Sequence, residues 1–294
     1  MQARPVVKWA GGKTQLLPAL LANMPSKFED YYEPFFGGGA FFFKLASMGK
    51  ITKSHLNDLN TNLITTYDVI KTRHLELIKD LSSAKYKNDE ETYYKLRSEE
   101  PSEPVKIAAR FIYLNKTGFN GLYRVNSKGK FNTPFGKYTN PKILDHDNIL
   151  AVHKTLQTDE LTTVDFEEAV KTAKKGDFVY FDPPYQPLSK TAKFTGYTAN
   201  SFGIKDQKRL LECFKRLNEK GCFVMLSNSD SPITRDLYQD FTINVVKASR
   251  AINCVGSKRG KINELIVTNY VPVKHQTELM FFTEPREERL MLTA

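Results

Sequence analysis

The sequence predicts an α/β fold built around a mostly parallel sheet. Short apolar runs that suit buried strands alternate along the chain with segments of helical periodicity. The clearest strand pattern is residues 178–181, which Gly176 precedes and two prolines follow, and proline cannot continue a sheet ladder. The last two strand patterns, residues 241–248 and 263–270, predict an antiparallel pair near the C-terminus.

Size and composition are those of a globular protein. The 294 residues suffice for one large domain, or for one domain with an insertion. Hydrophobic residues make up 40% and charged residues 26%, which is ordinary for a folded chain. No apolar run approaches the length of a membrane span, and the first five residues lack the apolar core of a signal peptide. Three cysteines without metal-like spacing predict a reducing compartment, which suits a bacterial-type cytoplasm.

Residues 31–45 predict a strand, a turn of three successive glycines at 37–39, and a helix. An ordinary tight turn needs one glycine, so three favour a turn that admits a small ligand at close range. The turn is not a dinucleotide fingerprint, because Phe42 stands where the third glycine of that motif is required. Nor is Gly11-Gly12-Lys13 a phosphate loop, since Lys8 breaks the pattern.

Residues 51–56 and 161–166 form two further strand patterns. Asp58 follows the first of them, 20 residues after Gly38. In nucleotide-binding α/β folds, an acidic residue at this distance holds the ribose hydroxyls. Asp58 suits the N-cap of the following helix equally well. Both roles are compatible if Asn60 caps that helix.

Residues 61–103 are helical in pattern and carry charges of both signs. The composition changes at residue 104, and residues 104–144 contain no Asp or Glu. Basic and aromatic side chains are interleaved there: Lys106, Arg110, Phe111, Tyr113, Lys116, Phe119, Tyr123, Arg124, Lys128, Lys130, Phe131, Phe135, Lys137, Tyr138 and Lys142. This mixture favours contacts to nucleic-acid phosphates and bases over the alternative of a solvated face above a core. The net charge of +10 also suits a polyanionic partner.

The strand at 178–181 ends in Asp182-Pro183-Pro184-Tyr185. Ligands of open α/β sheets bind just outside the carboxyl ends of the strands, so Asp182 and Tyr185 would lie at such an end on a stiffened turn. A proline-rich turn without function is the alternative. Residues 222–226 form another strand pattern, which ends in Ser227-Asn228.

Five motifs in this order resemble the Dam-type DNA adenine-N6 methyltransferases, a family of alpha-class amino-methyltransferases found in housekeeping and in GATC restriction-modification systems. The motifs are Trp9-Ala10-Gly11-Gly12-Lys13, Glu33-Pro34-Phe35-Phe36-Gly37-Gly38-Gly39, Asn57-Asp58, Phe119-Asn120-Gly121-Leu122-Tyr123-Arg124 and Asp182-Pro183-Pro184-Tyr185. The match runs from about residue 5 to 270. The last motif alone is shared with other amino-methylating enzymes.

The resemblance implies an S-adenosylmethionine-dependent methyltransferase fold, with a mostly parallel seven-stranded sheet, a C-terminal antiparallel hairpin and an inserted helical DNA-recognition domain. Residues 1–60 and 156–274 would form the catalytic domain, 61–155 the recognition insertion and 275–294 a tail. The implied activity is transfer of a methyl group to adenine N6 of duplex DNA, within GATC, without a metal. The implied partners are double-stranded DNA and a restriction endonuclease that acts on the same site without forming a stable complex. The resemblance also implies that the chain is a monomer and that it has no membrane partner.

The family's functional positions carry over residue by residue. Catalytic positions match Asp182, Pro183, Pro184 and Tyr185. Positions that contact S-adenosylmethionine match Trp9, Lys13, Gly37, Gly39, Asp58, Asp165, Phe166 and Asp182, with Asp165 and Phe166 at the cofactor's adenine. DNA-contacting positions match Lys8, Phe119, Asn120, Leu122, Arg124, Pro134 and Tyr138. Phe119 would insert at the flipped base, and Arg124 would read a guanine.

Two other classes of function compete with this one. An amino-methylating enzyme could act on cytosine N4 or on RNA, but the single insertion between Asp58 and Asp182 matches the DNA family. A DNA-binding regulator without catalysis would have no use for the intact Asp182, Tyr185 and glycine turn.

Overall fold

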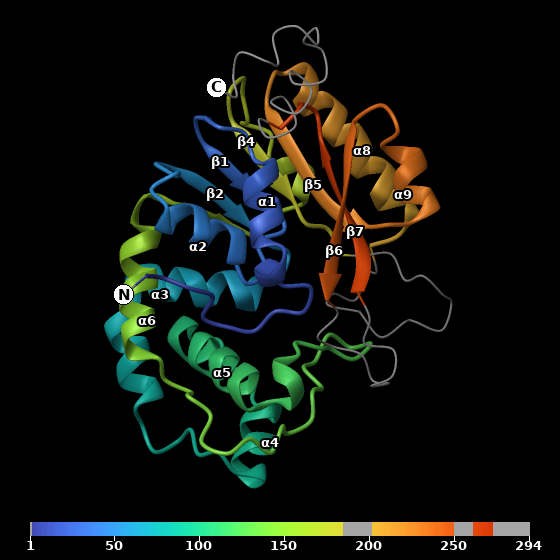
Figure 1. Cartoon of the computed structure of the whole chain (residues 1–294). Helices are drawn as coiled ribbons and strands as arrows, with labels where there is room; N and C mark the ends of the chain where they lie inside the picture. The colour runs from blue at the N-terminus through green and yellow to red at the C-terminus, as the bar shows by residue number, and fades with distance from the viewer. Residues whose placement is uncertain (1, 185–201, 250–260, 273–294) are drawn as a thin grey trace, which may run out of the picture.

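The computed structural model of the chain describes residues 2–184, 202–249 and 261–272. In these ranges the chain forms one sheet with helices on both faces (Figure 1). Tyr185 and the predicted tail at 275–294 lie outside the described residues. None of the described helices is long and apolar enough to cross a membrane.

Seven strands of the described chain form the sheet, in the order β3-β2-β1-β4-β5-β7-β6. They are β1 (Tyr31–Glu33), β2 (Ser54–Asn57), β3 (Glu160–Thr162), β4 (Phe178–Phe181), β5 (Phe223–Ser229), β6 (Thr242–Ser249) and β7 (Lys261–Thr268). Strands β1 to β5 pair in parallel, and β7 runs antiparallel to both β5 and β6. The predicted methyltransferase fold, with its C-terminal antiparallel hairpin, is confirmed.

The strand β4 is buried on both faces of the sheet. Because successive side chains of a strand point in opposite directions, Phe178 and Tyr180 join one core and Val179 and Phe181 join the other. The first core includes side chains of α1, α2, α3 and α5, and the second includes those of α8. A central parallel strand covered on both sides needs an unbroken apolar run, which is what residues 178–181 supply.

The helices are short except for α3, α5 and α8. Their bounds are α1 (Leu17–Asn23), α2 (Ala40–Ser47), α3 (Thr61–Leu81), α4 (Glu90–Ser98), α5 (Pro104–Thr117), α6 (His146–Thr155), α7 (Phe166–Ala169), α8 (Ile204–Glu219) and α9 (Pro232–Leu237). Three 3-10 turns occupy Lys13–Gln15, Phe119–Gly121 and Leu156–Thr158. Helix α3 packs against α5 and α6, and α4 against α5, at the lower end of the molecule in Figure 1.

One strand prediction was wrong in its extent. The pattern at 161–166 predicted a strand through Phe166, but β3 ends at Thr162. Asp165 is instead the N-cap of α7, where its carboxylate accepts a hydrogen bond from the backbone N–H of Glu167 at 3.1 Å. A short acidic side chain satisfies the exposed amides at a helix start, and this local bond ends the strand early.

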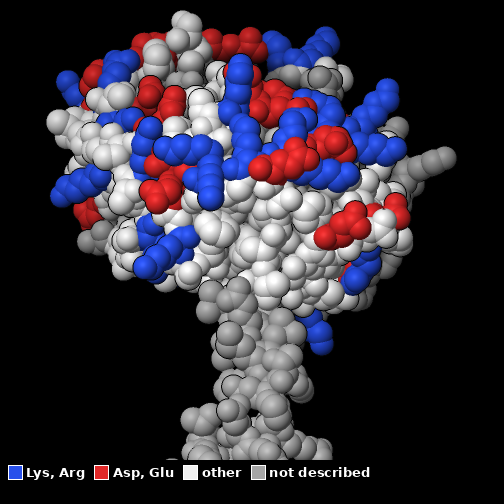
Figure 2. All heavy atoms as spheres, turned by 90° about the horizontal axis from the view of Figure 1, so that it is seen from above, with Lys and Arg blue, Asp and Glu red and all other residues white. Residues whose placement is uncertain are grey.

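Charge is distributed unevenly over the chain. The end of the molecule opposite α4 carries Lys and Arg side by side with Asp and Glu (Figure 2). The acid-free residues 104–144 comprise α5 and the chain that follows it. Four basic side chains of this segment serve the fold: Arg110 donates to the carbonyl oxygens of Leu96 and Arg97, and Lys106, Lys130 and Lys142 pair with Asp80, Glu100 and Asp145. These pairs bring acidic side chains from outside the segment next to its basic ones, while Lys130 and Lys142 stay exposed.

Candidate active site

The carboxyl edge of the sheet gathers the polar motifs. Strand β1 leads to the glycine turn, β2 to Asp58 and β4 to Asp182. Parallel strands end at the same edge, so motifs far apart in the sequence meet there. The side chain of Asn57 joins these loops, since its amide nitrogen donates to the carbonyl oxygens of Pro34 and Val164, both at 3.0 Å.

The glycine turn has a backbone that other residues rarely adopt. Gly37 and Gly39 have φ of 50° and 67°. A Cβ at Gly37 would lie 2.6 Å from Cδ1 of Trp9, so the indole packs directly on the turn. The backbone N–H of Gly37 donates to Oδ2 of Asp58 at 2.8 Å. Trp9, Gly37 and Asp58 are therefore neighbours, as the sequence predicted for a ligand site.

Of the two roles that the sequence left open for Asp58, the N-cap of the following helix belongs to Asn60. The carboxylate of Asp58 accepts from the N–H of Asn60 at 2.9 Å, and Asn60 in turn accepts from the N–H of Leu63 at 3.0 Å as the N-cap of α3. The helix is thus capped by Asn60. Burial raises the pKa of Asp58, and the two backbone amides that donate to it oppose that shift.

Asp182 is held by two donors on the same carboxylate oxygen. Nζ of Lys13 lies 2.6 Å from its Oδ1, and Oγ of Ser227 donates to Oδ1 at 3.0 Å. The side chain of Lys13 is 6% exposed and that of Asp182 19%. Burial raises the pKa of Asp182, while the Lys13 ammonium and the Ser227 hydroxyl lower it. The Lys13 ammonium thus offsets part of the cost of burying the Asp182 carboxylate.

Ser227 and Tyr180 are contacts of this site that the sequence did not reveal. The Tyr180 hydroxyl lies 2.9 Å from Oγ of Ser227, and both residues are buried. The available signal was the position of Ser227, a polar residue at the end of a strand pattern that adjoins the strand of Asp182. The sequence does not show which strands pair, so Ser227 could be placed beside Asp182 only once β5 was known to pair with β4.

Asp165 and Phe166 lie on the other face of the sheet. Phe166 stacks on Phe35 at a ring distance of 5.5 Å, and Phe35 directly precedes Phe36 and the glycine turn. Asp165 pairs with Arg209 of α8 at 2.8 Å, and the guanidinium of Arg209 also lies 4.9 Å from the centre of the Phe166 ring. Phe166 therefore contacts the residue that precedes Phe36 and the glycine turn, whereas Asp165 pairs with α8.

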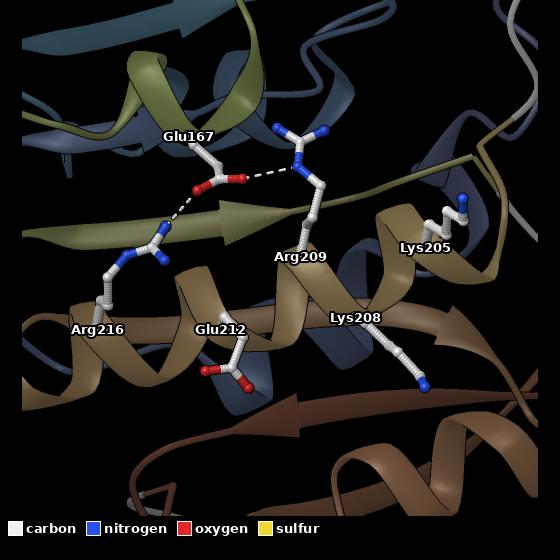
Figure 3. A pocket seen from close by; sticks show the side chains of 6 residues that line it. All are labelled: Glu167, Lys205, Lys208, Arg209, Glu212 and Arg216. Atoms are coloured by element: carbon white, nitrogen blue, oxygen red, sulfur yellow. Dashed lines mark hydrogen bonds and ion pairs between the residues drawn. The ribbon is translucent and has the colours of Figure 1, made fainter.

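A hollow of about 340 Å³ adjoins Arg209 on the outer side of α8. Glu167 lies between Arg209 and Arg216 and pairs with both (Figure 3). The lining consists of charged side chains only, from Glu167, Lys205, Lys208, Arg209, Glu212 and Arg216. It includes none of the glycine turn, Asp58 or Asp182, although Arg209 at its border also pairs with Asp165.

The 118–138 segment holds most of the predicted DNA-contacting residues. Its start is tied to the N-terminal loop by Asn115, whose side chain accepts from the N–H of Lys8 and donates to the carbonyl oxygens of Lys8 and Gly121 at 2.8 to 3.0 Å. The ammonium of Lys8 lies 5.2 Å from the centre of the Tyr138 ring. The structure therefore brings Lys8 and Tyr138 together from distant parts of the chain.

Arg124 is fixed within a hairpin of this segment. Its Nε donates to Oδ1 of Asn132 at 2.7 Å and its Nη2 to the Asn132 carbonyl at 3.1 Å. Val125 and Phe131 form an antiparallel bridge in the same hairpin, whose tip includes Ser127.

The turn at Phe119–Gly121, at the start of the 118–138 segment, is more open. Phe119 is 50% exposed, and its N–H donates to the carbonyl of Pro134 at 2.9 Å. Asn120 has φ of 56°, an uncommon conformation for a residue with a side chain. Leu122 is partly buried beside them. Because water solvates a phenyl ring poorly, an exposed Phe119 is a candidate contact for a partner.

Trp9 connects the two parts of the site. Its ring stacks on Tyr123 of the 118–138 segment at 5.5 Å and also packs on the glycine turn at Gly37. Within residues 2–184, 202–249 and 261–272, no group of three or more His, Cys, Asp or Glu side chains is placed to hold a metal ion.

The chain is similar to known DNA methyltransferases over most of its length. Residues 9–252 match the family model of D12 class N6 adenine-specific DNA methyltransferases. The chain is 48% identical to the Type II methyltransferase M1.LlaDCHI of Lactococcus lactis over 275 residues, which cover 91% of this chain and 95% of that protein. It is 42% identical to the Type II methyltransferase M.MjaIII of Methanocaldococcus jannaschii, with coverage of 92% and 100%. It is 36% identical to the DNA adenine methylase of Escherichia coli K12, with coverage of 90% and 94%.

Proposed function

The chain belongs to the D12 class of N6 adenine-specific DNA methyltransferases, and we propose that it methylates adenine N6 within GATC of duplex DNA. The observation that carries this proposal is the carboxylate of Asp182, which lies at the carboxyl end of β4 and is held by Lys13 and Ser227. Such a carboxylate is a fixed hydrogen-bond acceptor in a site of low polarity.

Asp182 and Pro183 would activate the amine. An exocyclic adenine amine is a poor nucleophile because its lone pair is delocalised into the ring. Asp182 accepts one N–H and the carbonyl of Pro183 accepts the other, which localises the lone pair toward the methyl donor and stabilises positive charge that develops on nitrogen. Pro184 stiffens the turn, and Tyr185 would stack on the base. Neither a metal nor a covalent intermediate is required for direct in-line transfer.

The residues at the carboxyl edge fit S-adenosylmethionine. The glycine turn offers backbone without side chains beside an indole, and Asp58 uses only two of its roughly four acceptor sites on Gly37 and Asn60. When bound, S-adenosylmethionine supplies a methyl group activated by a sulfonium. The residues proposed to hold it are Trp9, Lys13, Gly37, Gly39, Asp58, Asp165, Phe166 and Asp182.

DNA contacts are proposed for the 118–138 segment and the N-terminal loop. Phe119 is exposed and would fill the space left by a flipped base, a step needed because the amine is not reachable inside the duplex. Arg124 would read a guanine, with Lys8, Asn120, Leu122, Pro134 and Tyr138 around it. Residues 61–155 would thus form a recognition insertion in a catalytic domain made of 1–60 and 156–274, acting as a monomer.

A role in restriction-modification is the biological setting we favour. The relatives named Type II methyltransferases share 48% and 42% identity with the chain, against 36% for the DNA adenine methylase of Escherichia coli. A restriction endonuclease that cuts the same site would then be its functional partner, in the cytoplasm and without a stable complex.

The target site is tested on plasmid DNA. The plasmid is incubated with the protein and labelled S-adenosylmethionine, then challenged with a nuclease that adenine methylation at GATC blocks. We expect label incorporation and full protection, and nucleoside analysis should detect N6-methyldeoxyadenosine. Full cleavage together with label elsewhere would keep the enzyme class and reject the site. Label on cytosine, or on RNA in a parallel reaction, would support the competing amino-methylating activities.

A further inference from the structure

We propose that Tyr180 and Ser227 form a hydrogen-bond relay that orients the carboxylate of Asp182, so that Oδ2 is the oxygen presented to the target amine. Ser227 and Tyr180 are therefore positioning residues, which act through Asp182. This inference rests on the proposed function, because it assigns the orientation of the same catalytic group.

The sheet register places the relay. In the β4–β5 pair, Phe181 lies opposite Leu226, so Asp182 and Ser227 are the next residues of the two neighbouring strands. Ser227 points to the same face of the sheet as Tyr180, since the apolar residues that alternate with them belong to the opposite core. The hydroxyl of Ser227 therefore lies between Tyr180 at 2.9 Å and Asp182 at 3.0 Å.

The protons of the relay have one direction. A carboxylate only accepts, so the single hydroxyl proton of Ser227 is donated to Asp182. Ser227 must then accept from Tyr180, which donates its own phenolic proton. Burial, followed by the nearby charge of Asp182, raises the pKa of Tyr180 well above its usual value, so the phenol keeps that proton. Each hydroxyl makes a defined hydrogen bond, as a buried polar group requires.

Both protein donors occupy the same oxygen. Lys13 and Ser227 contact Oδ1, and within the described part of the chain no hydrogen bond to Oδ2 is found. Two donors on one oxygen resist rotation about the Cβ–Cγ bond of Asp182. The second oxygen is thereby aimed, and a carboxylate oxygen can accept an N–H donor. A carboxylate free to rotate would spend part of its time with the wrong oxygen toward the amine.

Acidic side chains of β1 and β7 also act on Asp182 and Tyr180. Glu33 of β1 is buried, and its pKa is raised well above the usual value, first by burial. It accepts from the Tyr31 hydroxyl at 2.8 Å and repels charge on Asp182. The charge of Glu264 on β7 raises the pKa of Tyr180 further. Lys13, from the N-terminal loop, is the cation that opposes them.

A second buried serine supplies a matched control. Ser54, at the start of β2, donates from Oγ to Oδ1 of Asp159 at 2.7 Å, and both residues are buried. This pair has the same chemistry as Ser227 and Asp182, but it lies at the opposite end of the sheet strands. Replacement of Ser54 removes a buried hydroxyl–carboxylate bond without touching the active site.

The test compares Ser227→Ala, Tyr180→Phe and Ser54→Ala in steady-state methylation of a duplex oligonucleotide. We expect Ser227→Ala to lower kcat roughly 10- to 100-fold, the range for a hydrogen bond to a charged group, with KM for both substrates little changed. The acid limb of the kcat–pH profile should move to higher pH, because the lost hydroxyl no longer lowers the pKa of Asp182. Tyr180→Phe should cause smaller changes in the same directions, and Ser54→Ala should lower only stability.

Three outcomes would overturn the proposal. A wild-type kcat and acid limb in Ser227→Ala would mean that the carboxylate needs no relay. Equal losses of kcat in Ser54→Ala, with no movement of the acid limb in any variant, would mean that the serines matter only for packing. If Ser227→Ala fails to fold, Tyr180→Phe decides alone, and an unmoved acid limb there rejects the relay. Retained turnover in Asp182→Ala would instead reject the proposed mechanism, so the two failures are distinguishable.

Discussion

The carboxyl edge of the sheet and the 118–138 segment hold their polar groups in different ways. At the edge, Asp58 and Asp182 are bound from several sides by backbone amides, an ammonium and a hydroxyl. In the 118–138 segment, Phe119 is half exposed and Asn120 is solvent-accessible in a left-handed conformation. The first region is organised before any ligand arrives, and the second presents surface that only a partner can cover.

This difference follows from what each region does in the proposed reaction. Groups that stabilise developing charge work best when they are already fixed in a site of low polarity. Groups that recognise DNA gain their energy by losing water against the duplex, so they stay exposed until binding. Arg124 is intermediate, because its Nε edge is fixed by Asn132 in a segment that is otherwise open.

The largest expected effect separates the two regions completely. Asp182→Ala should lower kcat by about 10³-fold, which is the upper range for removal of a fixed electrostatic contact. Affinity for a GATC duplex, measured by fluorescence anisotropy, should stay within about threefold of the wild type, because Asp182 would contact only the target amine and the other DNA contacts proposed for the chain remain. A variant that still turns over at a comparable rate would contradict the assignment of Asp182.

Asp58→Ala should weaken cofactor binding without affecting DNA binding. The carboxylate orders the glycine turn through Gly37, and it would contact the ribose, so its loss should cost about 2 to 3 kcal/mol by calorimetry. Asn60→Ala is the control, since it removes only the N-cap of α3 and should cost about 1 kcal/mol of stability with cofactor affinity retained. Equal affinities in Asp58→Ala and the wild type would leave Asp58 a purely local structural role.

Arg124→Ala tests the open region. If Arg124 reads a guanine, its loss should cost roughly 1–3 kcal/mol on GATC and relax the preference at one base position. Lys128→Ala in the same hairpin is the control, because an exposed lysine that contacts phosphate weakens binding to all sequences and reduces the salt dependence. Uniform weakening by Arg124→Ala would place that residue on the backbone instead.

Much of the architecture was accessible from the sequence because it depends on local patterns. The buried run at 178–181, the antiparallel C-terminal pair and the glycine turn all lie where the patterns placed them. The boundary near Asp165 was missed because a helix cap and a strand end compete over a few residues, and side-chain hydrogen bonding decides between them.

The sequence predicted those site residues that belong to a recognisable motif, but not the contacts between residues of different segments. The sequence identified Asp58, Asp182 and Lys13, but it did not show that Lys13 and Ser227, from segments distant along the chain, both contact Asp182. Ser227 becomes visible only when β5 is known to adjoin β4. The sequence likewise did not show that Arg110 and Lys106 of the basic segment bind groups of α4 and α3.

The smallest expected effect compares one glycine from each region. Gly37 and Gly129 both have positive φ, at 50° and 73°, so alanine at either position should cost about 1 kcal/mol of stability in backbone strain. A Cβ at Gly129 meets nothing within 4 Å, whereas a Cβ at Gly37 would lie 2.6 Å from the Trp9 ring. Trp9 is itself stacked on Tyr123, so it can move only by disturbing the second region. Urea unfolding should therefore show an additional loss of roughly 1 to 2 kcal/mol for Gly37→Ala relative to Gly129→Ala. Equal losses would show that the packing at the carboxyl edge yields as easily as the hairpin tip, and that the contrast between the regions lies in their hydrogen bonds alone.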